Sequence, residues 1–375
     1  MKLISLKAQR YRSLREETIP IRDLNLFIGA NASGKSTILD ALRFLHEGVR
    51  ERDFTPPVAS RGGIVHLAWK GEDAWEIDLT VLVEDDNRKY EWSIRLRPSG
   101  YEFSVHEEVC ELRSDRPPTL LLSADDGNGW WWSGEGRQVQ LKQNATVCGL
   151  SAAAADATFP ARGIAEFVKG WGFFDPNPFS LRRGWPGLES SRLDSFGRNL
   201  AERLFSLQRS SADTFEQIVT ATQSILGLPA EIEPRESEGR YYFAQRESGL
   251  RHMVHQIGAS SGTLRMLALM TALFGETESN LIGIEEPENH VHPTALAAFA
   301  AYLQKAKDRV QVLVTTHSPL LLDFLNDPSA VCVVRHDEQL GTRVNCEKDA
   351  DAILKALEVS DFGLGEFYET KGFGS

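Results

Sequence analysis

The chain has 375 residues, of which 42% are hydrophobic, and it carries a net charge of −12. Length and composition together provide for a large core and predict two domains, or one domain with insertions. The acidic balance argues against a protein coated in basic surface for gripping DNA, although it is compatible with a local basic patch.

Cysteine usage and hydropathy indicate the compartment. Cys110, Cys148, Cys332 and Cys346 are scattered without a CxxC pair, so we expect neither a disulfide framework nor a zinc site. The N-terminus lacks the apolar segment of a signal peptide, and no window of about 18 residues is apolar enough to span a membrane. We therefore expect a cytoplasmic protein with no membrane partner.

The first elements of the chain lead into a glycine-rich loop. Residues 2–8 alternate and predict a strand, and the apolar run 24–28 predicts a buried one. The next residues, GANASGKS from Gly29 to Ser36, match the nucleotide-binding pattern GxxxxGK[ST] in full. Apolar residues at helical spacing then predict a helix over 36–47. Strand, loop and helix in this order favour a phosphate-binding P-loop over an accidental glycine-rich turn.

The chemistry of a P-loop assigns roles to its residues. Glycines allow backbone N–H groups to close around phosphates, and the following helix N-terminus adds partial positive charge. Lys35 is expected to reach the β- and γ-phosphates, and the Ser36 hydroxyl to ligate Mg²⁺. We therefore predict ATP and Mg²⁺ as ligands, with nucleotide contacts from Gly29, Asn31, Ser33, Gly34, Lys35, Ser36 and Thr37.

From Ile64 to Val109 the pattern changes to period two, which predicts an antiparallel meander. The expected strands are 64–69, 75–83, 90–96 and 101–109. Residues 123–136 are turn-rich and contain three adjacent tryptophans, Trp130 to Trp132. Because tryptophan is usually largely buried, we interpret this segment as a hairpin whose rings cover the core edge, in preference to a partner-docking patch.

Residues 160–228 have a helical pattern, broken by a loop at 175–187, and are predicted to form a helical insertion. Its stretch 161–210 has eight basic and five acidic residues, which we interpret as a solvated helix face in preference to a nucleic-acid contact. Strands are expected again at 230–235, 240–246 and 251–256. The predicted domains are lobe I over 1–159, the insertion over 160–228, and lobe II over 229–375.

Lobe II contains an apolar strand that ends in carboxylates, LIGIEEPE at 281–288. Acids at the C-terminal end of a buried strand are typical of a Walker B element. Glu285 is expected to hold the Mg²⁺ shell, and Glu286 to deprotonate the attacking water. A second apolar strand at 310–314 precedes Thr316-His317-Ser318-Pro319, which places His317 to reach a γ-phosphate.

These motifs resemble those of ABC-type ATPases of the SMC/RecF/OLD-like group, and among them the small stand-alone AAA-type ATPases of bacteria. Four stretches carry the resemblance and cover residues 1–48 and about 256–335. They are the opening LKAQRYRSLREETIPIRDLNLFIGANASGKSTILDALRFL, then GASSGTLR at 258–265, IEEPENHVHP at 284–293, and LVTTHSP at 313–319.

The resemblance implies further roles. Glu286 falls at the catalytic base, His317 at the γ-phosphate sensor, and Glu285 at a metal position where many relatives have Asp. Ser260 and Gly262 match signature positions that act on the nucleotide of a second subunit, which implies a homodimer. Ala259 and Ser261 depart from the usual signature residues. The glutamine of the Q-loop is not identifiable, with Gln138, Gln140 and Gln143 as candidates.

Two other features could suggest a metal or a nuclease. His290 and His292 form a pair without a nearby third ligand, and the family has histidines in this turn without metal. OLD-type relatives append a nuclease domain after the switch histidine. The chain after His317 is too short for such a domain, so we expect any nuclease or toxin to be a separate chain.

The sequence thus predicts an α/β P-loop NTPase of the ABC-ATPase-like type, with a mixed sheet, an antiparallel β subdomain and a helical insertion. We expect a Mg²⁺-dependent switch ATPase that forms a head-to-tail homodimer and gates a separate effector in DNA maintenance or phage defence. DNA is a candidate partner. A transporter ATPase subunit and a nucleotide-responsive scaffold with little turnover are the alternatives.

Overall fold

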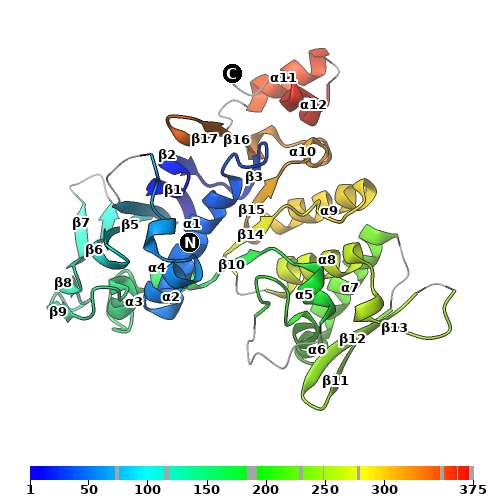
Figure 1. Cartoon of the computed structure of the whole chain (residues 1–375), viewed down its shortest axis with the longest axis horizontal. Helices are drawn as coiled ribbons and strands as arrows, with labels where there is room; N and C mark the ends of the chain where they lie inside the picture. Colours follow the sequence, from blue (N-terminus) through cyan, green and yellow to red (C-terminus); the bar gives the residue numbers. More distant parts are fainter. Residues whose placement is uncertain are drawn as a thin grey trace. The chain divides into compact units, whose positions relative to one another are not determined.

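The computed structural model describes residues 1–71, 76–113, 118–183, 192–227, 231–247, 249–276, 279–346, 350–360 and 362–370 (Figure 1). Trp75, residues 184–187 of the expected loop and the predicted boundary at residue 228 lie outside these ranges. The chain forms two compact units that interleave in sequence. Unit 1 comprises Met1–Arg22, Gly29–Trp171 and Cys332–Cys346, and unit 2 comprises Asp23–Ile28, Gly172–Val331 and Glu347–Ser375. The three-part division into lobes and an insertion stays a prediction.

Unit 1 is built on antiparallel strands in the order β16-β17-β2-β1-β4-β5-β6-β7-β8-β9. Antiparallel pairing of β4 with β5 and of β5 with β6 confirms the later strands of the predicted meander, and the pairing continues through β7 and β8 to β9. The strands are β1 (Lys2–Tyr11), β2 (Leu14–Pro20), β4 (Ile77–Asp85), β5 (Arg88–Ser99), β6 (Glu102–Arg113), β7 (Thr119–Asp125), β8 (Asn128–Trp132), β9 (Gln138–Lys142), β16 (Val331–Asp337) and β17 (Gly341–Cys346).

The helices of unit 1 surround α1, which buries an apolar stripe against α2, α3, α4 and β1 (Figure 1). Leu39, Leu42 and Leu45 of this stripe are fully buried. The spacing of its apolar residues therefore predicted the helix, which extends further than 36–47. The helices are α1 (Lys35–Glu51), α2 (Thr55–Ser60), α3 (Gly149–Ala153) and α4 (Arg162–Lys169), with a 3₁₀ turn η1 (Ile64–His66).

Unit 2 contains parallel strands in the order β10-β14-β15-β3, and a small antiparallel sheet of β11, β12 and β13. All residues of β3 and β15 are buried, which is the pattern expected for parallel strands covered on both faces. The strands are β3 (Leu24–Ile28), β10 (Trp171–Phe174), β11 (Glu231–Ser237), β12 (Arg240–Arg246), β13 (Val254–His255), β14 (Leu281–Glu285) and β15 (Gln311–Thr316).

In unit 2, α7 packs against α6, α8 and α9, and α10 packs against α9 and α12. Helix α8 continues into a π-helical turn, η3. The helices are α5 (Pro178–Arg182), α6 (Leu200–Ser210), α7 (Ala212–Leu226), α8 (Ser261–Met270), η3 (Thr271–Gly275), α9 (Pro293–Ala306), α10 (Pro319–Leu325), α11 (Ala350–Ser360) and α12 (Leu364–Glu369), with 3₁₀ turns η2 (Gln256–Gly258) and η4 (Pro328–Ala330).

Two sequence-based predictions of secondary structure were wrong. The expected strand at 64–69 is the turn η1, because Ile64 and Leu67 bury their side chains at helical rather than alternating spacing. The stretch 160–228 was expected to be helical, yet it contains the fully buried strand β10. In both cases a short apolar run was compatible with helix and strand, and tertiary packing decided between them.

The tryptophan segment forms the predicted hairpin, but its rings are not largely buried: Trp130 and Trp131 are half-buried, and Trp132 is 37% exposed. Trp130 and Trp132 lie on one face of β8 with ring centroids 5.8 Å apart. Trp131 points to the other face, where its indole N–H lies 3.5 Å from the carboxylate of Asp156. Strand β8 pairs with both β7 and β9, so residues 128–132 are not a loop.

The expectation about cysteines was wrong for one pair. Cys332 and Cys346 face each other across β16 and β17, with Cα atoms 3.9 Å apart, and form a disulfide. Cys110 and Cys148 are buried free thiols. A separation of 14 residues gives no local signal, because only the register of the hairpin brings the two sulfurs together.

We predict that alkylation in denaturant, without reductant, labels two cysteines, and that prior reduction raises the number to four. The two sites labelled first should be Cys110 and Cys148, as identified by peptide mass spectrometry. Closing a loop of this length should also stabilise the fold by about 3 kcal/mol in the chain-entropy treatment. Four labelled sites in oxidised, unreduced protein would contradict the cross-link.

Candidate functional site

The P-loop runs from Gly29 to Gly34 and enters α1 at Lys35. Gly34 caps the helix with φ +104°, and no side chain caps the first turn. N–H groups at such a helix start are available to an anion. The Lys35 ammonium is buried and donates to the carbonyls of Gly29 (2.8 Å) and Ala30 (2.9 Å). The lysine therefore lies folded against its own loop, with its charge at the start of the helix.

The loop packs against the β16–β17 hairpin, and this contact explains the glycines at positions 29 and 34. A Cβ atom at Gly34 would lie 1.8 Å from the Thr342 hydroxyl, and one at Gly29 would lie 2.1 Å from the Val334 carbonyl. Such distances are far below van der Waals contact. Only a residue without a side chain fits at either place.

Thr342 is the centre of a hydroxyl network under the loop, and the sequence did not reveal it. Its buried hydroxyl donates to the Ser33 carbonyl (3.0 Å) and lies 2.8 Å from the Ser13 hydroxyl. Ser13 in turn lies 3.0 Å from the hydroxyl of Thr37. The β16–β17 hairpin, α1 and the Tyr-Arg-Ser-Leu element at residues 11–14 are thus joined at the base of the P-loop.

Asp40 of α1 holds the other end of the Tyr-Arg-Ser-Leu element. Its carboxylate accepts a hydrogen bond from the Tyr11 hydroxyl (2.6 Å) and forms ion pairs with Arg12 (3.2 Å) and Arg61 (2.9 Å). Burial, reinforced by the negative charge of Asp40, raises the pKa of Tyr11 well above its usual range. The phenol therefore remains a donor at all physiological pH values.

The predicted Walker B strand is β14, and its register aligns it with β15 and β3. Glu285 pairs with Thr315, and Thr316 pairs with Ile28, so the carboxyl ends of the three strands share one edge. Glu286 follows with φ +43°, which is rare for a residue other than glycine and costs about 1–3 kcal/mol. Its N–H donates to the Thr315 carbonyl (2.9 Å), and its carboxylate accepts from the Asn289 amide (2.9 Å).

Glu288 is a functional candidate that the sequence did not assign. One of its carboxylate oxygens accepts from the Thr316 hydroxyl (2.7 Å) and the His317 N–H (2.8 Å), and lies 3.1 Å from His317 Nδ1. Its side chain is 8% exposed, whereas that of His317 is 44% exposed. Glu288 therefore orients an accessible imidazole. The sequence shows three acids in EEPE at 285–288, but it does not show that Glu288 is the one whose side chain is buried.

The signature residues lie at the start of α8. Ser260 is the N-cap, and its hydroxyl accepts from the Thr263 N–H (3.0 Å). A Cβ at Gly262 would lie 3.0 Å from the His290 carbonyl oxygen, so this glycine permits close approach of the turn after β14. Arg182 donates to the Ala259 carbonyl (3.1 Å) and the Ser261 hydroxyl (3.0 Å), which anchors the motif to α5.

His290 and His292 lie in the turn after β14 and at the start of α9. His290 has φ +66° in the turn, and the ring of His292 caps α9 by accepting from the Thr294 N–H (3.3 Å). Among the described residues, a grouping of three side chains with metal-ligand geometry occurs at His106, Asp125 and Asp126, and it includes neither histidine. There the ring nitrogen of His106 lies 3.3 Å from each carboxylate, as an exposed ion pair.

Two family models match the chain. Residues 1–96 match a family described as "AAA ATPase domain", and residues 159–323 match one described as "AAA domain, putative AbiEii toxin, Type IV TA system". The first range contains the P-loop, and the second contains β14, α8 and His317. The chain thus has two stretches that match AAA-type P-loop ATPase domains. No curated protein matches it.

Solved structures place the fold of this P-loop protein among SMC heads. An Smc head bound to the C-winged helix domain of ScpA has a TM-score of 0.58 at 14% identity, and the match covers 94% of this chain and 100% of that one. An Smc head with an extended coiled coil, bound to the C-terminal domain of ScpA from Pyrococcus furiosus, has a TM-score of 0.57 at 11% identity, covering 96% and 99%. At these identities the likeness is one of fold, and the predicted α/β class is confirmed.

The predicted site residues of this P-loop protein fall into two groups. Gly29 to Thr37 belong to unit 1, whereas Ser260, Gly262, Glu285, Glu286 and His317 belong to unit 2. Ser36 and Asn31 are exposed at the loop, and Glu285 and Glu286 are half-buried at their strand end. Hydroxyl and carboxylate oxygens of this kind fit a hard cation such as Mg²⁺. No helix within the described ranges is long and apolar enough to cross a bilayer.

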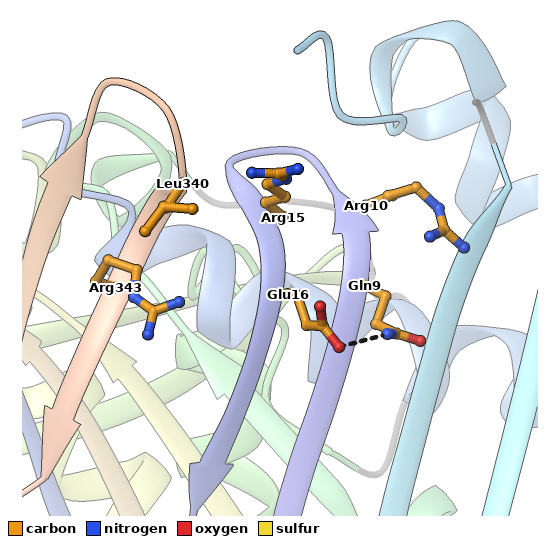
Figure 2. Close-up of a pocket in the computed structure, with 6 residues that line it drawn as sticks. All are labelled: Gln9, Arg10, Arg15, Glu16, Leu340 and Arg343. Carbon is orange, nitrogen blue, oxygen red and sulfur yellow. Dashed lines mark hydrogen bonds between the residues drawn. The ribbon is translucent and has the colours of Figure 1, made fainter. Parts of the chain in front are cut away.

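Unit 1 also carries a groove on β1, β2 and β17, and Figure 2 shows the side chains that line it. Its three arginines have polar partners. Arg10 lies 2.6 Å from the carboxylate of Asp78, and Arg343 lies 2.7 Å from that of Glu17. Arg15 donates to the Gln339 carbonyl (3.4 Å). The groove is therefore polar rather than strongly basic, and it adds no support for DNA binding. The lining residues are Gln9, Arg10, Arg15, Glu16, Leu340 and Arg343.

We predict that Thr342→Val lowers the free energy of unfolding by about 1–3 kcal/mol and weakens ATP binding. Valine keeps the shape of threonine but leaves the buried Ser33 carbonyl without this donor. Urea unfolding and calorimetric titration measure the two effects. Thr18→Val, at an exposed position of β2, is the matched control and should change neither. Equal stability of the two variants would contradict a supporting role for Thr342.

Proposed function

We propose that the protein is a Mg²⁺-dependent ATP hydrolase that acts as a switch in a head-to-tail homodimer. The observation that carries this proposal is the P-loop, whose lysine lies folded into the loop at an uncapped helix start. A triphosphate can replace the loop carbonyls as the partner of this ammonium and accept hydrogen bonds from N–H groups at the helix start. ATP is the nucleotide that AAA-type domains imply.

The strand register supports a shared role for the two groups of residues. Ile28 ends β3 beside Thr316, and the P-loop begins with the next residue of the chain. Glu285 and Glu286 follow the neighbouring parallel strand to the same edge. Parallel α/β sheets bind ligands at the carboxyl ends of their strands.

Each residue then has a task in phosphoryl transfer. Lys35 binds the β- and γ-phosphates, while Ser36 and Glu285 supply oxygens for Mg²⁺, which neutralises phosphate charge when bound. Glu286 orients the attacking water and accepts its proton, because its carboxylate projects from a fixed turn. His317, held by Glu288, contacts the γ-phosphate. Ser260 and Gly262 complete the site of the partner subunit.

The proposed biological role follows from the description of a matched family. The description of one matched family includes a type IV toxin–antitoxin system, and this favours a switch that gates a separately encoded nuclease or toxin in phage defence or DNA maintenance. DNA and a second copy of the chain are the other proposed partners, in the cytoplasm. The Tyr-Arg-Ser-Leu element and the EEPENHVHP turn favour this over a transporter subunit, and Glu286 favours it over a scaffold without turnover.

We expect Glu286→Gln to slow ATP hydrolysis by roughly 10²–10⁴-fold while ATP binding survives. The amide keeps the size of the side chain but cannot accept the proton. Light scattering with ATP should show more dimer than for the wild type. Lys35→Ala should instead abolish binding in calorimetric titration, and Lys305→Ala, at an exposed position of α9, is its control. Unchanged turnover in Glu286→Gln would remove Glu286 as the base.

We also expect two inactive variants to complement each other. Ser260→Arg chains should bind ATP but fail to complete the site of a partner, and Lys35→Ala chains should keep an intact signature. A heterodimer places both lesions in one composite site and leaves the other intact. The ATPase rate should therefore rise on mixing and peak near equal amounts. Ser260→Arg homodimers that hydrolyse ATP at the wild-type rate would refute the action of the signature in trans.

A further inference from the structure

Arg265 is a buried cation in the helix that carries the signature, and the P-loop chemistry does not explain it. Only 2% of the residue is exposed. Its guanidinium donates to the carbonyls of Pro176, Glu285 (2.8 Å) and Glu286 (3.0 Å). The carboxylate of Asp175 lies 3.3 Å away and is itself 43% exposed. Burying a guanidinium mainly against neutral carbonyls is costly, so a residue placed this way is expected to serve a purpose.

Two of the backbone carbonyls that Arg265 binds are those of Glu285 and Glu286, the two glutamates of the proposed hydrolytic site. Glu286 has a positive φ, a backbone conformation that a residue with a side chain adopts rarely. Both of its backbone polar groups are held: the N–H donates to the Thr315 carbonyl, and the carbonyl accepts from Arg265. The peptide planes on either side of Glu286 are therefore fixed, and with them the direction of its side chain.

Only an arginine can make this set of contacts. One terminal nitrogen of the guanidinium reaches Pro176, while the other reaches both glutamate carbonyls. A lysine ammonium is a single point and can serve one of these places but not both. The fork therefore ties the turn after β14 to the segment before α5, with α8 as its support.

We propose that Arg265 is a positioning residue for ATP hydrolysis, which holds Glu286 in the left-handed conformation that directs its carboxylate toward the attacking water. This inference rests on the proposed role of Glu286 as the base. Arg265 touches neither nucleotide nor water and acts through the backbone of Glu286. Because Ser260 caps the same helix five residues earlier, one helix carries both the signature and the arginine that holds the backbone of the base.

The test is a double-mutant cycle between Arg265 and Glu286. Arg265→Met should lower kcat by about 10–100-fold, because a misplacement of about 1 Å is enough for such a loss, while the KM for ATP stays within about twofold. Arg265→Lys should recover part of the rate. In a Glu286→Gln background the same Arg265 substitutions should have no further effect, because they act through the base that is already lost.

Matched controls separate positioning from stability. Arg203 of α6 is a part-buried arginine, with a side chain 14% exposed, that donates to a backbone carbonyl, that of Gly275, and pairs with a carboxylate, Glu276. Arg203→Met should lower the melting temperature at least as much as Arg265→Met, yet leave kcat per folded molecule unchanged. If Arg265→Met does not fold, the cycle is carried out with Arg265→Lys.

The outcomes distinguish this inference from the proposed function. If Glu286→Gln turns over ATP at the wild-type rate, the assignment of the base fails. If Glu286→Gln is impaired but the Arg265 variants keep the wild-type kcat, the positioning role of Arg265 fails alone. An equal loss from Arg265→Met in both backgrounds would also overturn it, since the residue would then act independently of Glu286.

Discussion

Parallel pairing of β3, β14 and β15 is the constraint on which the candidate site depends. Hydrogen bonds between parallel strands fix which residues stand side by side, and here Phe27, Glu285 and Thr315 share one level. The segments that follow these three strands must then start from the same edge of the sheet, at the carboxyl ends of the strands. Both faces of β3 and β15 are buried, so a slip of one residue would misplace every side chain in the close-packed layers on the two sides of the sheet.

Two backbone positions with positive φ show how the same difficulty is met in different ways. At residue 34 the chain uses glycine, because Thr342 occupies the space that a side chain would need. At residue 286 glycine would remove the carboxylate, so the chain keeps glutamate and stabilises the strained backbone with bonds from Arg265 and to Thr315. Where the chemistry needs only backbone the side chain is omitted, and where it needs a side chain the surroundings hold the backbone.

The sequence predicted the parts of the fold that depend on local pattern. The strand, loop and helix around the P-loop, the meander and the Walker B strand were all legible, because their side chains alternate or recur over many residues. The assignment failed at 64–69 and 171–174, where short apolar runs fit either element. The Cys332–Cys346 disulfide was missed, because its partners meet only through the register of a hairpin.

The candidate site was predictable in its chemistry but not in its supports. Residues that contact phosphate or metal occur in spaced motifs, because one loop or strand end must present them together. Thr342, Glu288 and Arg265 act instead on groups of distant segments, and the sequence around these positions does not indicate which segment each one contacts. A motif therefore records what a ligand must touch, whereas the residues that hold the motif in place are visible only once the chain has folded. In this chain Thr342 joins the β16–β17 hairpin to the P-loop, and Arg265 joins the signature helix α8 to the turn that follows β14.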